Sequence, residues 1–135
     1  MVANAFENMH YRVTNVTMDQ EYWKEDVDLI IHDADTDWKI EVKADWNIWK
    51  THNICLEMYN YKTNSNGWFK TTQSSHLVFV DMHNRFGYIF KTEELQKYVY
   101  ASAHTGAYCE KMMRGFECAL IPLASVSALY QVINL

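Results

Sequence analysis

A mixed α+β or α/β domain, with a mixed central β-sheet flanked by helices, is the fold class that the sequence predicts. The predicted centre is the stretch of residues 27 to 45, VDLIIHDADTDWKIEVKAD, in which a polar turn joins two short strands. Apolar and charged side chains alternate in its second half, as in a strand with one buried face. Short apolar runs and a helical spacing follow one another further along the chain, which favours strands and helices in one layered domain.

The elements before and after this hairpin are predicted in chain order. Residues 2 to 10 are expected to form a short helix, and β-branched residues indicate a strand at 11 to 17. Residues 18 to 26 are expected to be a connection or a continuation of that strand. Further strands are predicted at 53 to 59, 76 to 81, 88 to 90 and 116 to 123, with a loop at 60 to 67 and a short polar helix at 70 to 75.

A helix is predicted to begin at residue 92. Thr92 is the expected N-cap, and Glu93 and Glu94 follow in the first turn, where acidic side chains are favoured. Residues 103 to 114 have no clear pattern, and Gly115 is a candidate helix end. Residues 125 to 135 are expected to cover the sheet as a short apolar segment.

Length and composition indicate one globular domain that spans residues 1 to 135. Hydrophobic residues make up 49% of the chain and charged residues 21%, which is ordinary for a folded protein. The net charge of −5 argues against nonspecific coating of nucleic acid, which needs a surplus of Lys and Arg. It leaves room for a metal-dependent nuclease, because divalent cations neutralise the carboxylates of such a site.

Several other classes of protein are disfavoured by the sequence. Cys55, Cys109 and Cys118 form no CxxC pair, so a reducing, cytoplasmic location is expected. The six histidines form no HxH or HxxxH pair, which disfavours zinc. We also expect no nucleotide cofactor, because no Gly-rich phosphate loop is present, and no membrane association, because no apolar run has membrane-spanning length.

Three charged side chains are predicted to meet on one face of the hairpin. Asp28 precedes the apolar run of the first strand, and Glu41 and Lys43 share one side of the second. A solvated hairpin face is the alternative reading of this pattern. An acid placed at the start of an apolar run is not expected of a plain surface strand, so we interpret the trio as a candidate site.

The same residues carry a resemblance to a known family. Asp28, an apolar strand, a turn and then Glu41-Val42-Lys43 resemble the PD-(D/E)xK motif of the restriction-endonuclease-like nuclease superfamily, with Val27 in place of the usual proline. The separation of Asp28 and Glu41 is similar to that in archaeal Holliday-junction resolvases. Residues 51 to 57, 66 to 68 and 70 to 76 resemble segments of small phage proteins of this superfamily. The resemblance implies a restriction-endonuclease-like core, an endonuclease activity and, if phage-encoded, the cytoplasm of a host cell.

The chemistry of such a motif follows from its donor atoms. Mg²⁺ prefers hard oxygen ligands, which Asp28, Glu41 and the backbone carbonyl of Val42 could supply, and Mn²⁺ is expected to substitute. Lys43 would then lie near a metal-bound water and stabilise the negative charge that develops on phosphate. The run Asp33, Asp35 and Asp37, like Asp26, is interpreted as part of a solvated turn, because a calcium loop would need a Gly and a distal Glu.

Other residues are candidates for supporting roles. Glu57 is either an extra metal ligand or a surface acid, and the resemblance implies an upstream helical acid for which Glu7 and Glu21 are candidates. Thr72 and Gln73 are expected either to bind a phosphate or water or to cap the short helix.

A small Mg²⁺-dependent DNA endonuclease is the function that the sequence favours. A chain of this size is expected to act as a homodimer or to recognise branched or nicked DNA. A catalytically silent nuclease-like fold that binds protein, as an inhibitor or accessory subunit, is the alternative, and RNA is a further possible substrate. The expected DNA contacts are Lys50, Lys62, Lys70, Trp68 and the aromatic segment of residues 46 to 49.

Overall fold

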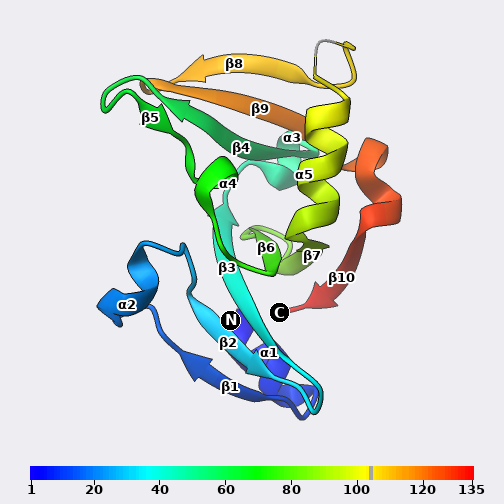
Figure 1. Ribbon diagram of the computed structural model, residues 1–135. Coiled ribbons are helices and arrows are strands. Elements are labelled where there is room, and N and C mark those ends of the chain that lie inside the picture. The colour runs from blue at the N-terminus through cyan, green and yellow to red at the C-terminus, as the bar shows by residue number, and fades with distance from the viewer. Residues whose placement is uncertain (104) are drawn as a thin grey trace.

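A computed structural model describes residues 1 to 103 and 105 to 135 and confirms the mixed α+β class, with a central mixed sheet flanked by helices (Figure 1). The first half of the chain contains α1 (Val2–Asn8), β1 (Arg12–Asn15), α2 (Gln20–Trp23), β2 (Leu29–His32), β3 (Asp37–Asp45), α3 (Ile48–Thr51), β4 (Asn53–Asn60), β5 (Ser65–Asn66) and α4 (Trp68–Thr71). The second half contains β6 (His76–Asp81), β7 (Phe86–Lys91), α5 (Thr92–Ala101), β8 (Cys109–Met113), β9 (Phe116–Pro122), the 3-10 helix η1 (Leu123–Leu129) and β10 (Tyr130–Asn134).

The central sheet has six strands in the order β1-β2-β3-β6-β7-β10. Strands β3 and β6 pair in parallel, and the other neighbours pair antiparallel. The parallel register places Glu41 beside Leu77 and Lys43 beside Phe79. This register matters for the site, because it determines which core side chains lie next to the two charged residues.

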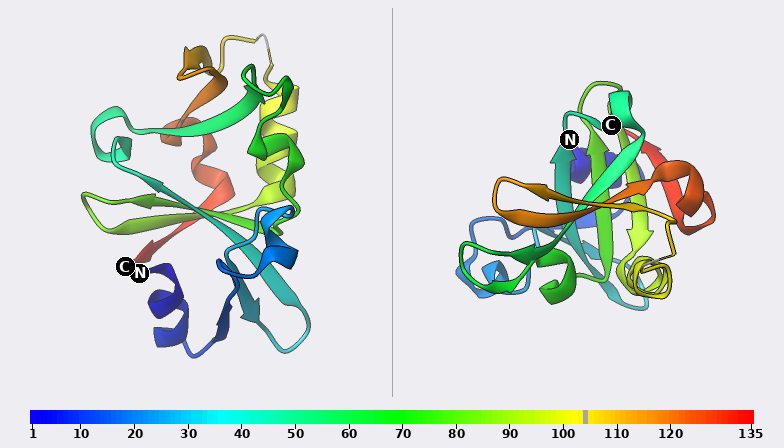
Figure 2. Two further views of the ribbon diagram at one scale, coloured as in Figure 1. Left: turned by 90° about the vertical axis from the view of Figure 1, so that its left-hand side faces the viewer. Right: turned by 90° about the horizontal axis from the view of Figure 1, so that it is seen from above.

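A second sheet of four antiparallel strands lies across the first, in the order β5-β4-β9-β8 (Figure 2). Its strands β4 and β9 pair residue for residue from Asn53 with Pro122 to Glu57 with Cys118, and a register shift follows between Glu57 and Tyr59. The sequence predicted one sheet. The division into two depends on pairings between residues about sixty positions apart, which local patterns do not encode.

Two hydrophobic clusters hold the layers together. Val2 and Phe6 of α1 pack against Ile31, Ile40 and neighbouring residues on one face of the six-stranded sheet. The larger cluster fills the space between the two sheets and continues onto α5 and η1; its fully buried members include Ile54, Leu56, Phe69, Leu77, Phe79, Phe90, Leu95 and Ile121. The helices therefore cover opposite faces of the central sheet.

Three predictions about local structure were wrong. Residues 18 to 26 contain the short helix α2, which Asp19 caps by accepting a hydrogen bond from the Glu21 N–H. The helix expected near residues 70 to 75 spans Trp68–Thr71 instead. Lys91 rather than Thr92 is the N-cap of α5, and Thr92 is its first residue, buried against Ser74.

The C-terminal third also differs from expectation. Residues 103 to 114, apart from residue 104, which lies outside the described residues, contribute the edge strand β8, and Gly115 has the left-handed φ of a tight turn into β9. Residues 125 to 135 form the end of η1 and then β10, which pairs with β7 at the edge of the central sheet. Among the described residues, none of the helices has both the length and the apolar character needed to cross a membrane.

Candidate functional site

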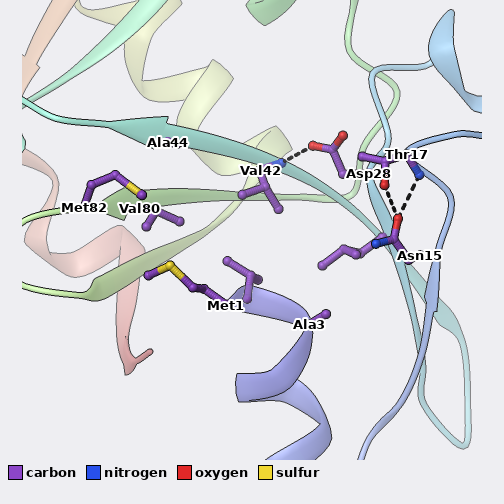
Figure 3. Close-up of a pocket in the computed structure, with 11 residues that line it drawn as sticks. Met1, Ala3, Asn15, Thr17, Asp28, Val42, Ala44, Val80 and Met82 are labelled. Atoms are coloured by element: carbon purple, nitrogen blue, oxygen red, sulfur yellow. Dashed lines mark hydrogen bonds between the residues drawn. The ribbon is translucent and has the colours of Figure 1, made fainter.

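The candidate site begins where β2 and β3 separate. Their pairing ends at Leu29 and Ile40, and the Asp28 N–H still donates to the Ile40 carbonyl at 2.8 Å. Beyond that point the side chain of Asp28 replaces the neighbouring strand: its Oδ2 accepts a hydrogen bond from the Val42 N–H at 2.8 Å. Figure 3 shows this bond at the level of β3. A half-buried strand N–H is thereby satisfied by a carboxylate, which holds Asp28 at the level of β3.

Alternation along β3 places Glu41 and Lys43 on the face opposite to α1. Ile40 lies in the cluster under α1, whereas Glu41 and Lys43 share the other face with their parallel partners Leu77 and Phe79. The residue Glu41 is only 5% exposed. Its Oε1 lies 2.5 Å from the Nζ of Lys43, so the buried carboxylate has a charged hydrogen-bond partner.

The electrostatics of Glu41 are unusual for a surface hairpin. Burial raises the pKa of Glu41 to about 7, and the nearby Lys43 opposes this rise without cancelling it. The negative charges of Asp28 and Asp26 raise it further. Removal from water is thus the main reason why the charged form of Glu41 is disfavoured, and Lys43 offsets only part of it.

Asp26 is a member of the site that sequence reasoning missed. It was interpreted as part of a solvated turn, but it adopts a left-handed φ of 54°, and burial raises the pKa of its carboxyl. Lys43 and a long hydrogen bond of 3.5 Å from the Thr71 hydroxyl lower the same pKa, while Asp28 raises it. The only sequence signal was its position two residues before Asp28, since the left-handed turn itself is not visible in a sequence.

Helix α4 covers the site from the side of the second sheet. The ring of Trp68 lies over Lys43, with 4.4 Å between the Nζ atom and the ring centroid. The same ring contacts Phe69 and Phe79, so Trp68 is half-buried on the core. The sequence predicts a DNA contact for Trp68, which stays a prediction; in the structure its ring lies over the Lys43 ammonium.

The donor atoms fit a hard divalent cation. Asp28 and Glu41 offer carboxylate oxygens. The third candidate ligand is the backbone carbonyl of Val42, which follows Glu41 directly in β3 and whose N–H donates to Asp28. In the portion of the chain that the structure describes, no three His, Cys, Asp or Glu side chains are grouped so as to hold a metal ion by themselves.

A cavity of about 410 Å³ reaches Asp28 from the side of α1. Figure 3 shows Met1, Val80 and Met82 at its apolar end, and Asn15, Thr17 and Asp28 at its polar end. Asn15 Oδ1 accepts hydrogen bonds from the backbone N–H and the hydroxyl of Thr17, which orders this rim. Asp28 therefore lines a hollow on the side of α1 as well as accepting the Val42 N–H.

Glu57 is not brought to the site. It lies on β4 in the second sheet, and the alternation with Leu56, which enters the core, turns Glu57 to the opposite face. There it pairs across the sheet with Cys118, and its charge raises the pKa of both Cys55 and Cys118 after the larger effect of burial.

Neither candidate for the upstream acid reaches the hairpin. Glu7 is exposed on α1, which covers the face of the sheet opposite to Glu41. Glu21 is exposed on α2, near the cap of that helix. The carboxylates whose charges act on Glu41 are Asp28 and Asp26 instead.

Thr72 and Gln73 line a different hollow. A polar cavity of about 530 Å³ opens between residues 72 to 76 and the start of α5. The Thr72 hydroxyl is bonded to that of Ser74 at 2.9 Å, which in turn lies 3.3 Å from the Thr92 hydroxyl. The structure therefore gives Thr72 a role in joining α4 to α5, and the Gln73 N–H donates to the Glu25 carbonyl beside the site.

The lysines predicted to contact DNA are all exposed but lie on separate elements. Lys50 is in α3, Lys70 is in α4 next to Trp68, and Lys62 follows β4 and packs against the turn at Gly115. The residues Trp46 and Trp49 are 67% and 43% exposed. Trp49 stacks on His83 with 4.4 Å between ring centroids, so one of the two indoles is held in place.

Comparisons with known proteins give one distant similarity. No family model matches the chain. No curated protein sequence matches it either. A solved structure, that of the bacterial homing endonuclease I-Ssp6803I, is similar to it with a TM-score of 0.49 and 18% identity, over 72% of this chain and 61% of that one. The chain thus spans less than two thirds of the length of the protein that it resembles.

Proposed function

We propose that this protein is a metal-dependent DNA endonuclease that hydrolyses phosphodiester bonds, in the manner of the PD-(D/E)xK enzymes. One observation carries the proposal. A carboxyl, Glu41, is buried at the splayed end of a hairpin beside Asp28 and Asp26; burial, and to a smaller degree these acids, raises its pKa to about 7, and it contacts the ammonium of Lys43 at 2.5 Å. A pure scaffold gains little from burying an acid in this way, since the desolvation of an ion pair can cost as much as the pairing returns.

Each residue has a role that follows from its position. Mg²⁺ or Mn²⁺ held by Asp28 and Glu41 would polarise a phosphate oxygen and acidify a water molecule. Asp28 is kept at the level of β3 by the Val42 N–H, so its carboxylate is oriented before any ligand arrives. Lys43 donates hydrogen bonds to oxygen atoms that become more negative as water attacks phosphorus and the leaving oxygen departs.

The approach of DNA must overcome the net charge of −5. Lys70 is exposed on α4, the helix that carries Trp68, and Lys50 and Lys62 are exposed on other elements. Local lysines attract phosphates even when the total charge is negative, and they make binding sensitive to salt. A single small domain has little area for reading a long sequence, so we expect branched or nicked DNA as substrate, or the action of a homodimer.

Cleavage of plasmid and branched DNA in Mg²⁺ or Mn²⁺ tests the proposal. The wild type should cut, and Glu41→Gln and Lys43→Ala should each lose at least about a hundredfold in rate. Glu93→Gln is the matched control, because Glu93 is an exposed acid on α5 that pairs with Lys97. A wild type that cuts with no metal, or variants that cut as fast as the wild type, would refute the assignment.

The second candidate function is a catalytically silent nuclease-like fold that binds another protein. The exposed indoles of Trp46 and Trp49 favour it, since aromatic side chains often anchor protein interfaces. In that case the wild type would cut nothing, and Trp46→Ala would abolish capture of the partner while Glu41→Gln would leave it intact.

A further inference from the structure

The side chain of Lys43 has two partners of different kinds. Its Nζ atom lies 2.5 Å from Glu41 Oε1 and 4.4 Å from the centroid of the Trp68 ring. Only 30% of the lysine side chain is exposed, so these contacts determine where the ammonium points. A lysine has four rotatable bonds and loses its direction when contacts of this sort are removed.

The contact with Glu41 conflicts with the proposed role of Glu41. Glu41 Oε1 contacts the ammonium, and a carboxylate that turns toward a metal cation gives up part of that contact. Trp68 has no such conflict, because an indole face binds a cation through its ring and is no ligand for Mg²⁺. The Trp68 face is therefore the contact that can hold Lys43 at the site when Glu41 is engaged.

Trp68 is itself held firmly by both neighbouring layers. Its ring packs on Phe79, which is the parallel partner of Lys43 in β6, so the register places lysine and phenylalanine side by side under one indole. The preceding residue, Gly67, donates its N–H to the Met58 carbonyl of β4 at 2.9 Å. On the other side of α4, Gln96 of α5 donates to the Phe69 carbonyl at 3.0 Å.

We propose that Trp68 is a positioning residue for Lys43, in that its ring keeps the lysine ammonium directed at the reacting phosphate during hydrolysis. This inference rests on the proposed endonuclease function. In this arrangement β4 of the second sheet holds Gly67 and α4 in place, and α4 in turn orients Lys43 of the central sheet. It also gives Trp68 a role that does not involve contact with DNA.

Single-turnover cleavage of a branched DNA gives the first arm of the test. Trp68→Leu should lower the maximal rate at least about tenfold with little change in the half-saturating DNA concentration, and Trp68→Phe should restore most of the rate, since a phenyl face also binds cations. Trp38→Leu is the matched control: Trp38 is a half-buried indole of β3 that stacks on His76, outside the site. Its loss should leave the rate unchanged.

A double-mutant cycle separates positioning from a direct effect on DNA. In a Lys43→Ala background the indole has no ammonium to orient, so Trp68→Leu should cause no further loss of rate. A further loss of tenfold in that background, or a rise in the half-saturating DNA concentration alone, would overturn the inference and indicate that Trp68 binds DNA.

Proton NMR of Lys43 gives a readout independent of catalysis. The ε-protons of a lysine over an indole face are shifted upfield by the ring current, and this shift should be present in the wild type and abolished in Trp68→Leu. An active wild type with an ordinary Lys43 shift overturns the positioning role alone. A wild type that cuts no DNA overturns the endonuclease function and the positioning role with it.

Discussion

The carboxylate of Asp28 accepts a hydrogen bond from the backbone N–H of Val42 at 2.8 Å, at the point where β2 leaves β3. A side chain therefore replaces a strand in satisfying an amide of the central sheet. The same carboxylate is a proposed ligand for the metal ion. Asp28 thus has a structural role and a chemical role that mutation can separate.

Asp28→Asn and Asp28→Ala should differ in stability but not in activity. Both remove the negative charge, so both should abolish metal-dependent cleavage. The amide oxygen of asparagine can still accept the Val42 N–H, whereas alanine leaves it unpaired at a free-energy cost of about 1 to 3 kcal/mol. Urea unfolding of the two metal-free variants measures this difference. Equal stabilities would show that the hydrogen bond contributes nothing to the fold.

The pKa of Glu41, raised to about 7, has a consequence for stability without metal. The folded protein holds this proton more tightly than the unfolded chain does, so ionisation destabilises the fold as the pH rises from the ordinary value of 4.5 to about 7. Glu41→Gln should therefore be more stable than the wild type at about pH 8, by up to about 3 kcal/mol, and equal to it at about pH 4.

Denaturant unfolding in the presence of a chelator, at both pH values, measures this dependence on Glu41. If Glu41→Gln is less stable than the wild type at the higher pH, the ion pair with Lys43 outweighs the effect of burial. The carboxyl would then be an ordinary ion-pair partner rather than a site in need of positive charge.

Gly67 is predicted to tolerate no side chain. A Cβ atom there would lie 2.1 Å from the Glu57 carbonyl oxygen, which belongs to the backbone of β4 and cannot move aside. Gly67→Ala should lower the free energy of unfolding by about 3 kcal/mol or more and displace α4. Gly87→Ala is the control, because its Cβ would meet side chains rather than backbone, Ile133 at 2.9 Å and Val78 at 3.3 Å, and it should cost less than Gly67→Ala. Similar losses in the two variants would contradict the tight approach of α4 to β4.

Lys70 is predicted to contribute more to DNA binding than Lys50 or Lys62, because α4 also carries the residue over Lys43. Removing a lysine that contacts one phosphate reduces the slope of log K against log salt concentration by about one. Binding of branched DNA by Lys70→Ala, measured across a range of salt concentrations in Ca²⁺, should show that change. Lys97→Ala on α5 should show none, and equal effects of the two would remove α4 from the DNA-binding surface.

The hairpin and its charged trio could be predicted from the sequence because strand alternation is local. Glu41 and Lys43 fall on one face of β3 by period alone, and Asp28 follows from the apolar run after it. The positions of Asp26 and Glu57 could not be predicted in this way. The first depends on a left-handed residue in a loop, and the second on pairing of β4 with β9, which removes that strand from the central sheet.

The place of Trp68 was hidden for a related reason. Its ring meets Lys43 because β3 and β6 are parallel and α4 approaches from the second sheet. A search for aromatic residues near lysines in the sequence would have favoured Trp46 and Trp49, which lie closer to Lys43 along the chain but are exposed in the structure. Long-range register, rather than local pattern, decides which aromatic residue belongs to the site.

Paramagnetic broadening by Mn²⁺ tests the central claim most directly, which is that Asp28 and Glu41 bind a divalent cation. In ¹⁵N-labelled protein, substoichiometric Mn²⁺ should first abolish the amide signals of Asp28, Glu41 and Val42, and Glu41→Gln should prevent this. Broadening centred instead on the turn of Asp33, Asp35 and Asp37, or equal broadening in wild type and variant, would contradict the account.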